Sequence, residues 1–96
     1  MSKINDINNL QVEVVNGDVK VVEIGWLEVE VIFEDRSYVL EFETTEQAMS
    51  RGNVFTVEFY DKDSIKLAKQ IGFEITEDFK TELYKQWGKY SNKTFR

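Results

Sequence analysis

The stretch WLEVEVIFEDRSYVLEFET, residues 26–44, predicts two antiparallel strands joined by a tight turn. Apolar and charged residues alternate along both arms, which is the pattern of strands with one buried face. Because side chains repeat every two residues, a shift of one residue would expose the whole apolar set. A turn at Asp35–Arg36 keeps that set together in three opposed pairs: Phe33–Tyr38, Val31–Leu40 and Val29–Phe42.

The opposite face of this hairpin gathers carboxylates. In the same register Glu30 lies opposite Glu41, and Glu28 lies opposite Glu43. Like charges opposed across a hairpin destabilise it by about 0.2–1 kcal/mol. Trp26 falls in phase with these glutamates, so a large aromatic side chain borders the acidic patch. We therefore take Trp26, Glu28, Glu30, Glu41 and Glu43 as the candidate binding residues.

Flanking segments predict further elements. In LQVEVVNGDVKVVEI, residues 10–24, the Asn16–Gly17 dipeptide favours a two-residue hairpin turn that opposes Val14 to Val19 and Val12 to Val21. Residues 44–52 carry a capping pattern that predicts a short helix, and residues 54–60 predict a fifth strand. A second helix starts at Asp61 or Asp63 and stops at Gly72, and a third starts near Thr76. Its apolar stripe is Phe79, Leu83, Trp87 and Tyr90.

These elements define an α+β fold in the order ββββαβαα. We expect a twisted antiparallel sheet of about five strands, made of two N-terminal hairpins plus one later strand. Two to three helices would pack on its apolar face. The chain of 96 residues corresponds to a single domain, 1–96, with residues 1–9 and 91–96 loosely ordered.

The composition restricts the chemistry. The chain has no cysteine and no histidine, which removes thiolate metal sites, the commonest general base and every Ser-His or Cys-His nucleophile. We therefore expect no enzyme, no catalytic residue, no metal site and no cofactor. Without an apolar run of about 18 residues or a signal-type N-terminus, the expected location is the cytoplasm, away from any membrane.

The charge is uneven along the chain. Residues 1–60 hold four Lys/Arg and twelve Asp/Glu, whereas residues 76–96 hold five and three, within a net charge of −6. An acidic body repels nucleic acid and suits a basic partner. The carboxylates on the hairpin could be a solvated face, a divalent-metal site or an imitation of the phosphates of nucleic acid.

Our leading hypothesis is a small, non-enzymatic interaction protein of the accessory or inhibitor type found in phages and mobile elements. It would bind another protein, such as a basic nucleic-acid-binding protein, through the acidic sheet face, and would not bind nucleic acid directly. Homo-oligomerisation is left open. The alternative is a small-ligand or divalent-metal-binding module, with a pocket between sheet and helices lined by Tyr38, Tyr60, Tyr84 and Trp87.

Overall fold

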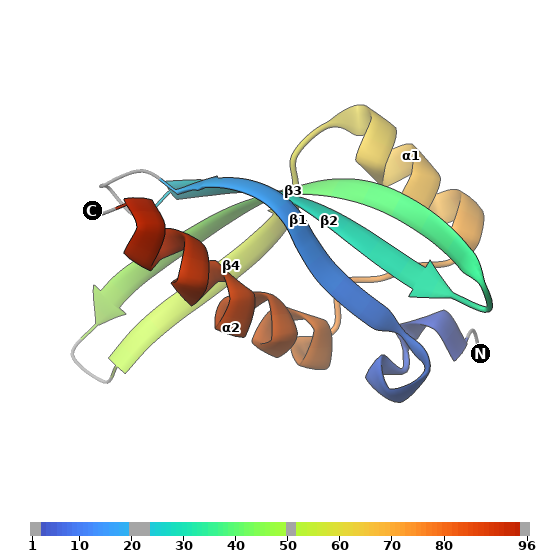
Figure 1. The fold of residues 1–96 in the computed structure, drawn as a ribbon, viewed down its shortest axis with the longest axis horizontal. Helices are drawn as coiled ribbons and strands as arrows, with labels where there is room; N and C mark the ends of the chain where they lie inside the picture. The colour runs from blue at the N-terminus through green and yellow to red at the C-terminus, as the bar shows by residue number, and fades with distance from the viewer. Residues whose placement is uncertain (1–2, 20–23, 50–51, 95–96) are drawn as a thin grey trace.

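The computed structural model describes residues 3–19, 24–49 and 52–94, which form four strands and two α-helices (Figure 1). Two short 3-10 turns, η1 (Lys3–Asn5) and η2 (Ile7–Asn9), precede the first strand. The strands are β1 (Gln11–Val19), β2 (Ile24–Phe33), β3 (Arg36–Met49) and β4 (Gly52–Phe59). The helices are α1 (Lys62–Ile71) and α2 (Glu77–Thr94).

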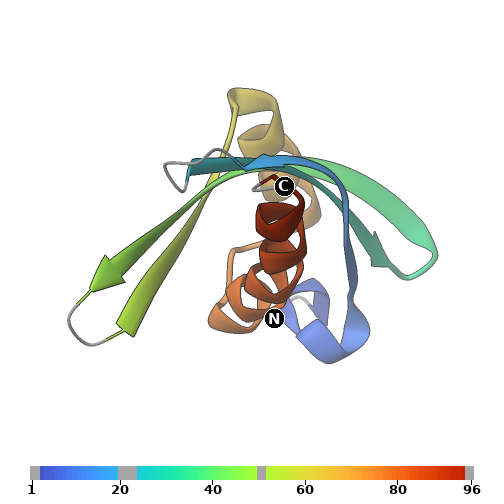
Figure 2. The same ribbon diagram turned by 60° about the vertical axis from the view of Figure 1, so that its left-hand side comes forward.

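The α+β class is confirmed, but the order is ββββαα rather than ββββαβαα. The strands form one antiparallel sheet in the order β1-β2-β3-β4, so each strand pairs with its neighbour in sequence. This sheet is bent into an arch, with α2 beneath its concave side (Figure 2). We call the face toward α2 the inner face and the opposite face the outer face.

The turn between β2 and β3 falls one residue earlier than predicted. Its central residues are Glu34 and Asp35, with φ of 50° and 66°, the left-handed values that a type I′ turn needs at both positions. Phe33 therefore pairs with Arg36, and every opposed pair differs from the prediction. The division into two faces survives, because moving both ends of the turn by one residue leaves the alternation unchanged.

The predicted first hairpin is wrong. Asn16 and Gly17 lie inside β1, which pairs with β2 along its whole length, and neither has a positive φ. A bulge at Val15 shifts the register between Val14 and Asn16, so the chain passes the Asn-Gly site without turning. Val12 and Val14 oppose Val31 and Val29 of β2 instead; residues 20–23, which include the predicted partner Val21, lie outside the described residues.

The predicted helix over residues 44–52 is also wrong. Here β3 continues to Met49 and pairs with β4, the strand predicted over residues 54–60, from Phe42–Phe59 to Met49–Gly52. Thr44 and Thr45 are β-branched, and Thr45 makes a hydroxyl contact with Thr56 across the ladder. Pairing with an apolar strand thus overrides the local capping pattern.

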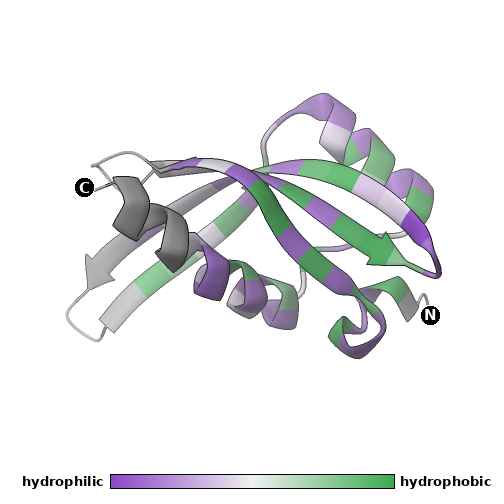
Figure 3. Cartoon of the chain, in the orientation of Figure 1, coloured by the Kyte–Doolittle hydropathy of each residue, from purple (hydrophilic) through white to green (hydrophobic). Residues whose placement is uncertain are grey.

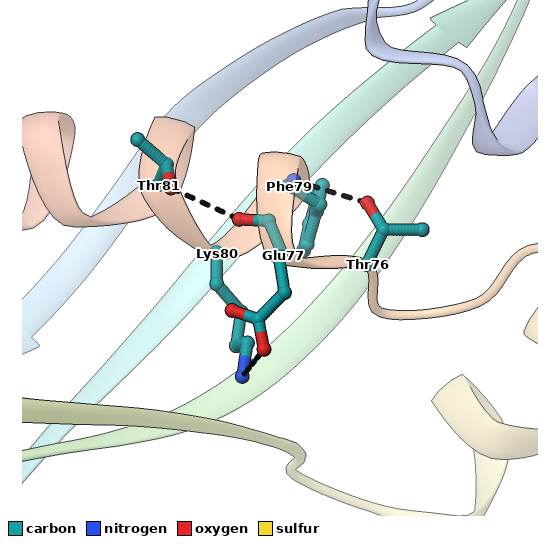
Figure 4. A network of polar contacts seen from close by, with 5 residues as sticks. All are labelled: Thr76, Glu77, Phe79, Lys80 and Thr81. Atoms are coloured by element: carbon teal, nitrogen blue, oxygen red, sulfur yellow. Dashed lines mark hydrogen bonds and ion pairs between the residues drawn. The ribbon is translucent and has the colours of Figure 1, made fainter.

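Helix α1 begins and ends at its predicted signals, and α2 begins at its predicted cap. Asp61 caps α1 by accepting a hydrogen bond from the Ser64 N–H at 2.9 Å, and Gly72 ends it with φ of 77°. Thr76 caps α2 by accepting from the Phe79 N–H at 3.1 Å (Figure 4). In the same turn Lys80 Nζ lies 3.1 Å from Glu77 Oε1. The Thr81 hydroxyl donates to the Glu77 carbonyl at 3.0 Å.

The core lies between the inner face and α2. Along the strands, hydrophobic positions alternate with hydrophilic ones (Figure 3). Of the predicted apolar set, four residues are fully buried and two, Phe33 and Tyr38, are half-buried. The predicted stripe of α2 is buried at Phe79, Leu83 and Trp87, and the side chain of Tyr90 is outside the described part. The main buried residues are Leu27, Val29, Val31, Leu40, Phe42, Phe73, Phe79, Leu83 and Trp87.

The two helices reach different parts of the sheet and share one core, because Ala68 of α1 is buried in the same cluster as Phe79 and Leu83 of α2. α2 lies on the inner face, where its Gln86 amide bonds the backbone of β1: Oε1 accepts from the Val14 N–H at 2.7 Å and Nε2 donates to the Val12 carbonyl at 3.1 Å. α1 lies beside β3, whose Glu41 N–H donates to the Ser64 hydroxyl at 2.9 Å. Each helix therefore reaches a backbone edge of the sheet.

Regular structure extends toward both ends of the described chain. Ile4 is buried in the core, and Asn5 accepts a hydrogen bond from the Glu74 N–H at 2.7 Å. At the other end α2 continues to Thr94, so four of the last six residues are helical.

Asp35 provides a test of the turn. A non-glycine residue with left-handed φ carries a penalty of about 1 kcal/mol, which glycine avoids. We expect Asp35→Gly to raise the free energy of unfolding by about 0.5–1 kcal/mol, and Asp35→Val to lower it, because a β-branched side chain fits this conformation poorly. Urea unfolding of the two variants beside the wild type measures both effects. A stabilising valine would contradict the described turn.

Candidate functional site

The outer face carries seven carboxylates from all four strands. The residues predicted as binding residues, Trp26, Glu28, Glu30, Glu41 and Glu43, all lie on it, because each is out of phase with the buried positions of its strand. The prediction missed three further members: Glu13 and Asp18 of β1, and Glu58 of β4. Their alternation with apolar neighbours was visible in the sequence. The incorrectly predicted first hairpin, however, paired Glu13 and Asp18 with other residues. We call this set the acidic face: Glu13, Asp18, Glu28, Glu30, Glu41, Glu43 and Glu58.

Glutamates oppose each other directly at all three strand pairings. Glu13 pairs with Glu30 between β1 and β2. Glu28 pairs with Glu41 between β2 and β3, and Glu43 pairs with Glu58 between β3 and β4. The predicted pairs Glu30–Glu41 and Glu28–Glu43 are wrong because of the shifted turn. The like-charge opposition itself is present, and it extends over the whole width of the sheet.

No basic side chain offsets this charge from within the strands. Across the described strand residues the one lysine or arginine is Arg36, whose alternation with Tyr38 and Leu40 places it with the inner set. Within the described part of the chain no member of the acidic face forms an ion pair; the ion pair found there joins Lys80 and Glu77 of α2. Among the described residues, the acidic face is therefore a region of negative charge without an ion-pair partner.

An aromatic pair adjoins these carboxylates. Trp26 lies opposite Glu43 and is half-buried, and its indole Nε1 donates to Glu41 Oε1 at 2.9 Å. Tyr60, just after β4, is 52% exposed, and its ring meets that of Trp26 edge-to-face at a centroid distance of 6.4 Å. The hydrogen bond fixes the indole on the outer face, so Trp26 and Tyr60 form a defined apolar contact surface beside the acidic face.

Asp61 adds a carboxylate at the edge of the acidic face. Hydrogen bonds from the Ser64 N–H and hydroxyl hold the pKa of Asp61 below its usual value of 3.8, and desolvation opposes them in part. Its main role is capping α1. Because the Glu41 backbone N–H also donates to the Ser64 hydroxyl oxygen, the α1 N-terminus is attached directly to the acidic face.

The aromatic residues predicted to line one pocket are not brought together. Tyr60 lies on the outer face, and Trp87 is buried in the core as its periodicity indicated, its Nε1 without a hydrogen-bond partner among the described residues. Tyr84 lines a cavity of about 190 Å³ beside Phe55. Tyr38 lines a separate, open cavity of about 500 Å³ near the turn between β2 and β3.

Two further findings concern the described residues as a group. They contain no cluster of three or more acidic side chains placed to hold a metal ion. None of their helices has the length and apolar character needed to cross a membrane.

Comparison with known proteins gives no relative. No protein-family model matches the sequence, and neither the curated proteins nor the solved structures gave a significant match. Function must therefore be argued from the geometry of this chain alone.

Glu58 tests the repulsion on the acidic face. Glu58→Lys replaces a like-charge pair with an opposite-charge pair across the ladder, so we expect it to stabilise the fold by about 0.5–1 kcal/mol at low salt and by less at high salt. Glu77→Lys makes the same change of charge but breaks the ion pair with Lys80 and puts a cation at a helix N-terminus, so it should destabilise. Urea unfolding at two salt concentrations checks both. A Glu58→Lys protein no more stable than the wild type would show that the repulsion is negligible.

Asp61 predicts the direction in which the stability of the fold changes with pH. Because its pKa is lower in the folded chain, the ionised carboxylate contributes stability that is present at neutral pH and is lost as the pH falls through the folded pKa, below 3.8. Asp61→Asn keeps a capping oxygen but cannot titrate. The unfolding free energies of wild type and variant should therefore converge as the pH falls below about 4. A difference that stays constant down to pH 2 would contradict this role.

Proposed function

We propose that this chain is a non-enzymatic interaction protein whose acidic face binds a basic surface of another protein. The observation that carries the proposal is the set of three directly opposed glutamate pairs, which no cation among the described outer-face residues of the strands offsets. Each pair costs about 0.2–1 kcal/mol. That is a notable fraction of the roughly 5–15 kcal/mol by which a domain is stable. A basic partner would turn this repulsion into attraction.

The spacing of the carboxylates suits an extended partner surface. Neighbouring strands lie about 4.8 Å apart, and residues on one face of a strand repeat about every 6.8 Å. The acidic face is thus a two-dimensional array of negative charge on a convex surface (Figure 2). Such an array resembles the phosphates of a nucleic acid more than a pocket for a single ion. Proteins that bind nucleic acid in a positively charged groove are the partner class that fits, and the cysteine-free composition favours a cytoplasmic encounter.

Trp26 and Tyr60 provide the apolar anchor of the proposed interface. Charged rims mainly steer association and set its salt dependence, whereas buried aromatic residues contribute most of the binding energy at protein interfaces. Trp26 is already fixed by its bond to Glu41, so little side-chain entropy would be lost when a partner covers it.

The test is capture from a lysate by the immobilised chain, followed by competition with duplex DNA. We expect a nucleic-acid-binding protein to be retained at low salt, released at high salt, and displaced by the DNA. Changing Glu28, Glu30, Glu41 and Glu43 to glutamine together should weaken its binding roughly tenfold or more.

A matched control removes the same number of charges elsewhere. The combination Glu34→Gln, Asp35→Asn, Asp63→Asn and Asp78→Asn changes four exposed carboxylates outside the acidic face. It should leave the affinity for the captured protein within about twofold, apart from the general effect of net charge. Equal losses in both variants, or retention that resists high salt, would contradict binding through the acidic face.

A further inference from the structure

The chain closes two of the open edges of its sheet with its own groups. On β1, an edge strand, the Gln86 amide bonds the Val14 N–H and the Val12 carbonyl. On β3, before the pairing with β4 begins, the Glu41 N–H donates to the Ser64 hydroxyl and the Glu41 carbonyl accepts from the Tyr60 N–H, each at 2.9 Å. Unpaired strand edges readily pair with other chains, and proteins commonly cover them.

The free edge of β4 has no such cover among the described residues. The Tyr60 N–H points toward β3, so by alternation the backbone groups of Phe55, Val57 and Phe59 point away from it. No described residue makes a hydrogen bond to these groups. Residues 52–59 also lack the features that discourage pairing, since they hold no proline and no lysine, and their one charged residue is Glu58.

We propose that β4 pairs in antiparallel fashion with β4 of a second copy of this chain, which joins two sheets into one of eight strands. The two-fold axis would pass through Val57. Val57 then faces its own copy, Phe55 faces Phe59 of the second copy, and Thr56 faces Glu58 of the second copy. All apolar pairs lie on the inner face, as they do within the monomer.

Two other registers of the β4–β4 pairing are less favourable. An axis through Glu58 would oppose the two Glu58 side chains, adding one more repulsive pair. An axis through Thr56 would leave Phe59 opposite Asn53 of the second copy. Pairing about Val57 is therefore the register in which the strand is most complementary to itself.

A cavity beside β4 supports this arrangement. It has a volume of about 190 Å³ and is lined by Phe55 of β4 and by residues of the first two turns of α2, with no residue from β3. The rings of Phe55 and Tyr84 already meet at a centroid distance of 4.8 Å, with their planes tilted by 44°. In the proposed register Phe59 of the second copy stands next to Phe55 and so extends this aromatic cluster.

The β4 dimer and binding at the acidic face should depend on salt concentration in opposite ways. Each copy has a net charge of −6, so screening should strengthen the dimer, whereas it should weaken binding to a basic partner. The two proposals are independent, because β4 pairs through its edge and the acidic face lies on the outer surface.

Sedimentation equilibrium over a range of protein concentrations tests the proposal. We expect a monomer–dimer equilibrium that shifts to dimer as salt rises. Thr56→Lys places a cation opposite Glu58 of the second copy twice per dimer, and Thr56→Glu places an anion there. At low salt, the dissociation constant of the dimer should fall roughly three- to tenfold in Thr56→Lys and rise by a similar factor in Thr56→Glu. Both variants lose the same contact with Thr45, so each controls for the other.

Hydrogen exchange in the wild type gives a second measurement that needs no variant. The amides of Phe55, Val57 and Phe59 should exchange more slowly as protein concentration rises, while those of Thr56 and Glu58, which face β3, should not change. A monomer at all concentrations would overturn the proposal, even if a strand of another protein binds there. A dimer whose affinity moves in the same direction in both Thr56 variants would overturn it as well.

Discussion

The two-residue turn at Glu34–Asp35 is the constraint on which the rest of the structure depends. Two consecutive left-handed residues close the β2–β3 hairpin, and these long central strands give β1 and β4 their places. Because alternation has a period of two, this turn decides which side chains meet α2 and which meet solvent. The hydrophobic core and the acidic face are thus two results of one register.

Coverage of backbone edges explains much of what the helices do. β1 is an edge strand, and β4 pairs with β3 only from Phe42 to Met49, so one side of β1 and one side of the first part of β3 lack a neighbouring strand. Gln86 of α2 takes the place of a strand at β1, and Ser64 of α1 does so at β3. Neither role follows from an amphipathic pattern, because one polar side chain on each helix performs it. Against these two closed edges, the open edge of β4 is a specific feature of the fold.

The sequence predicted what depends on local alternation and on capping residues. The apolar set of the central hairpin, the ends of α1 and the start of α2 followed from such signals, and so did the common face of Trp26 and four glutamates. Predictions that needed a choice between competing partners were wrong. Asn16–Gly17 is a strong turn signal, yet pairing with the long β2 strand prevails there, and residues 44–49 extend because β4 lies beside them. The edge contacts of Gln86 and Ser64 join residues 72 and 23 positions apart, which no local pattern indicates.

The central claim is that the register places the glutamates of neighbouring strands in direct opposition on one face. Glu41 directs both backbone groups away from β2, so Glu28 and Glu41 form a non-hydrogen-bonded pair, in which the two Cα atoms lie closest. The most direct measurement is the pattern of Hα–Hα nuclear Overhauser effects in solution. The structure predicts strong effects between Glu28 and Glu41 and between Trp26 and Glu43. Strong effects between Val31 and Leu40 and between Val29 and Phe42 would instead place the turn at Asp35–Arg36 and contradict the register.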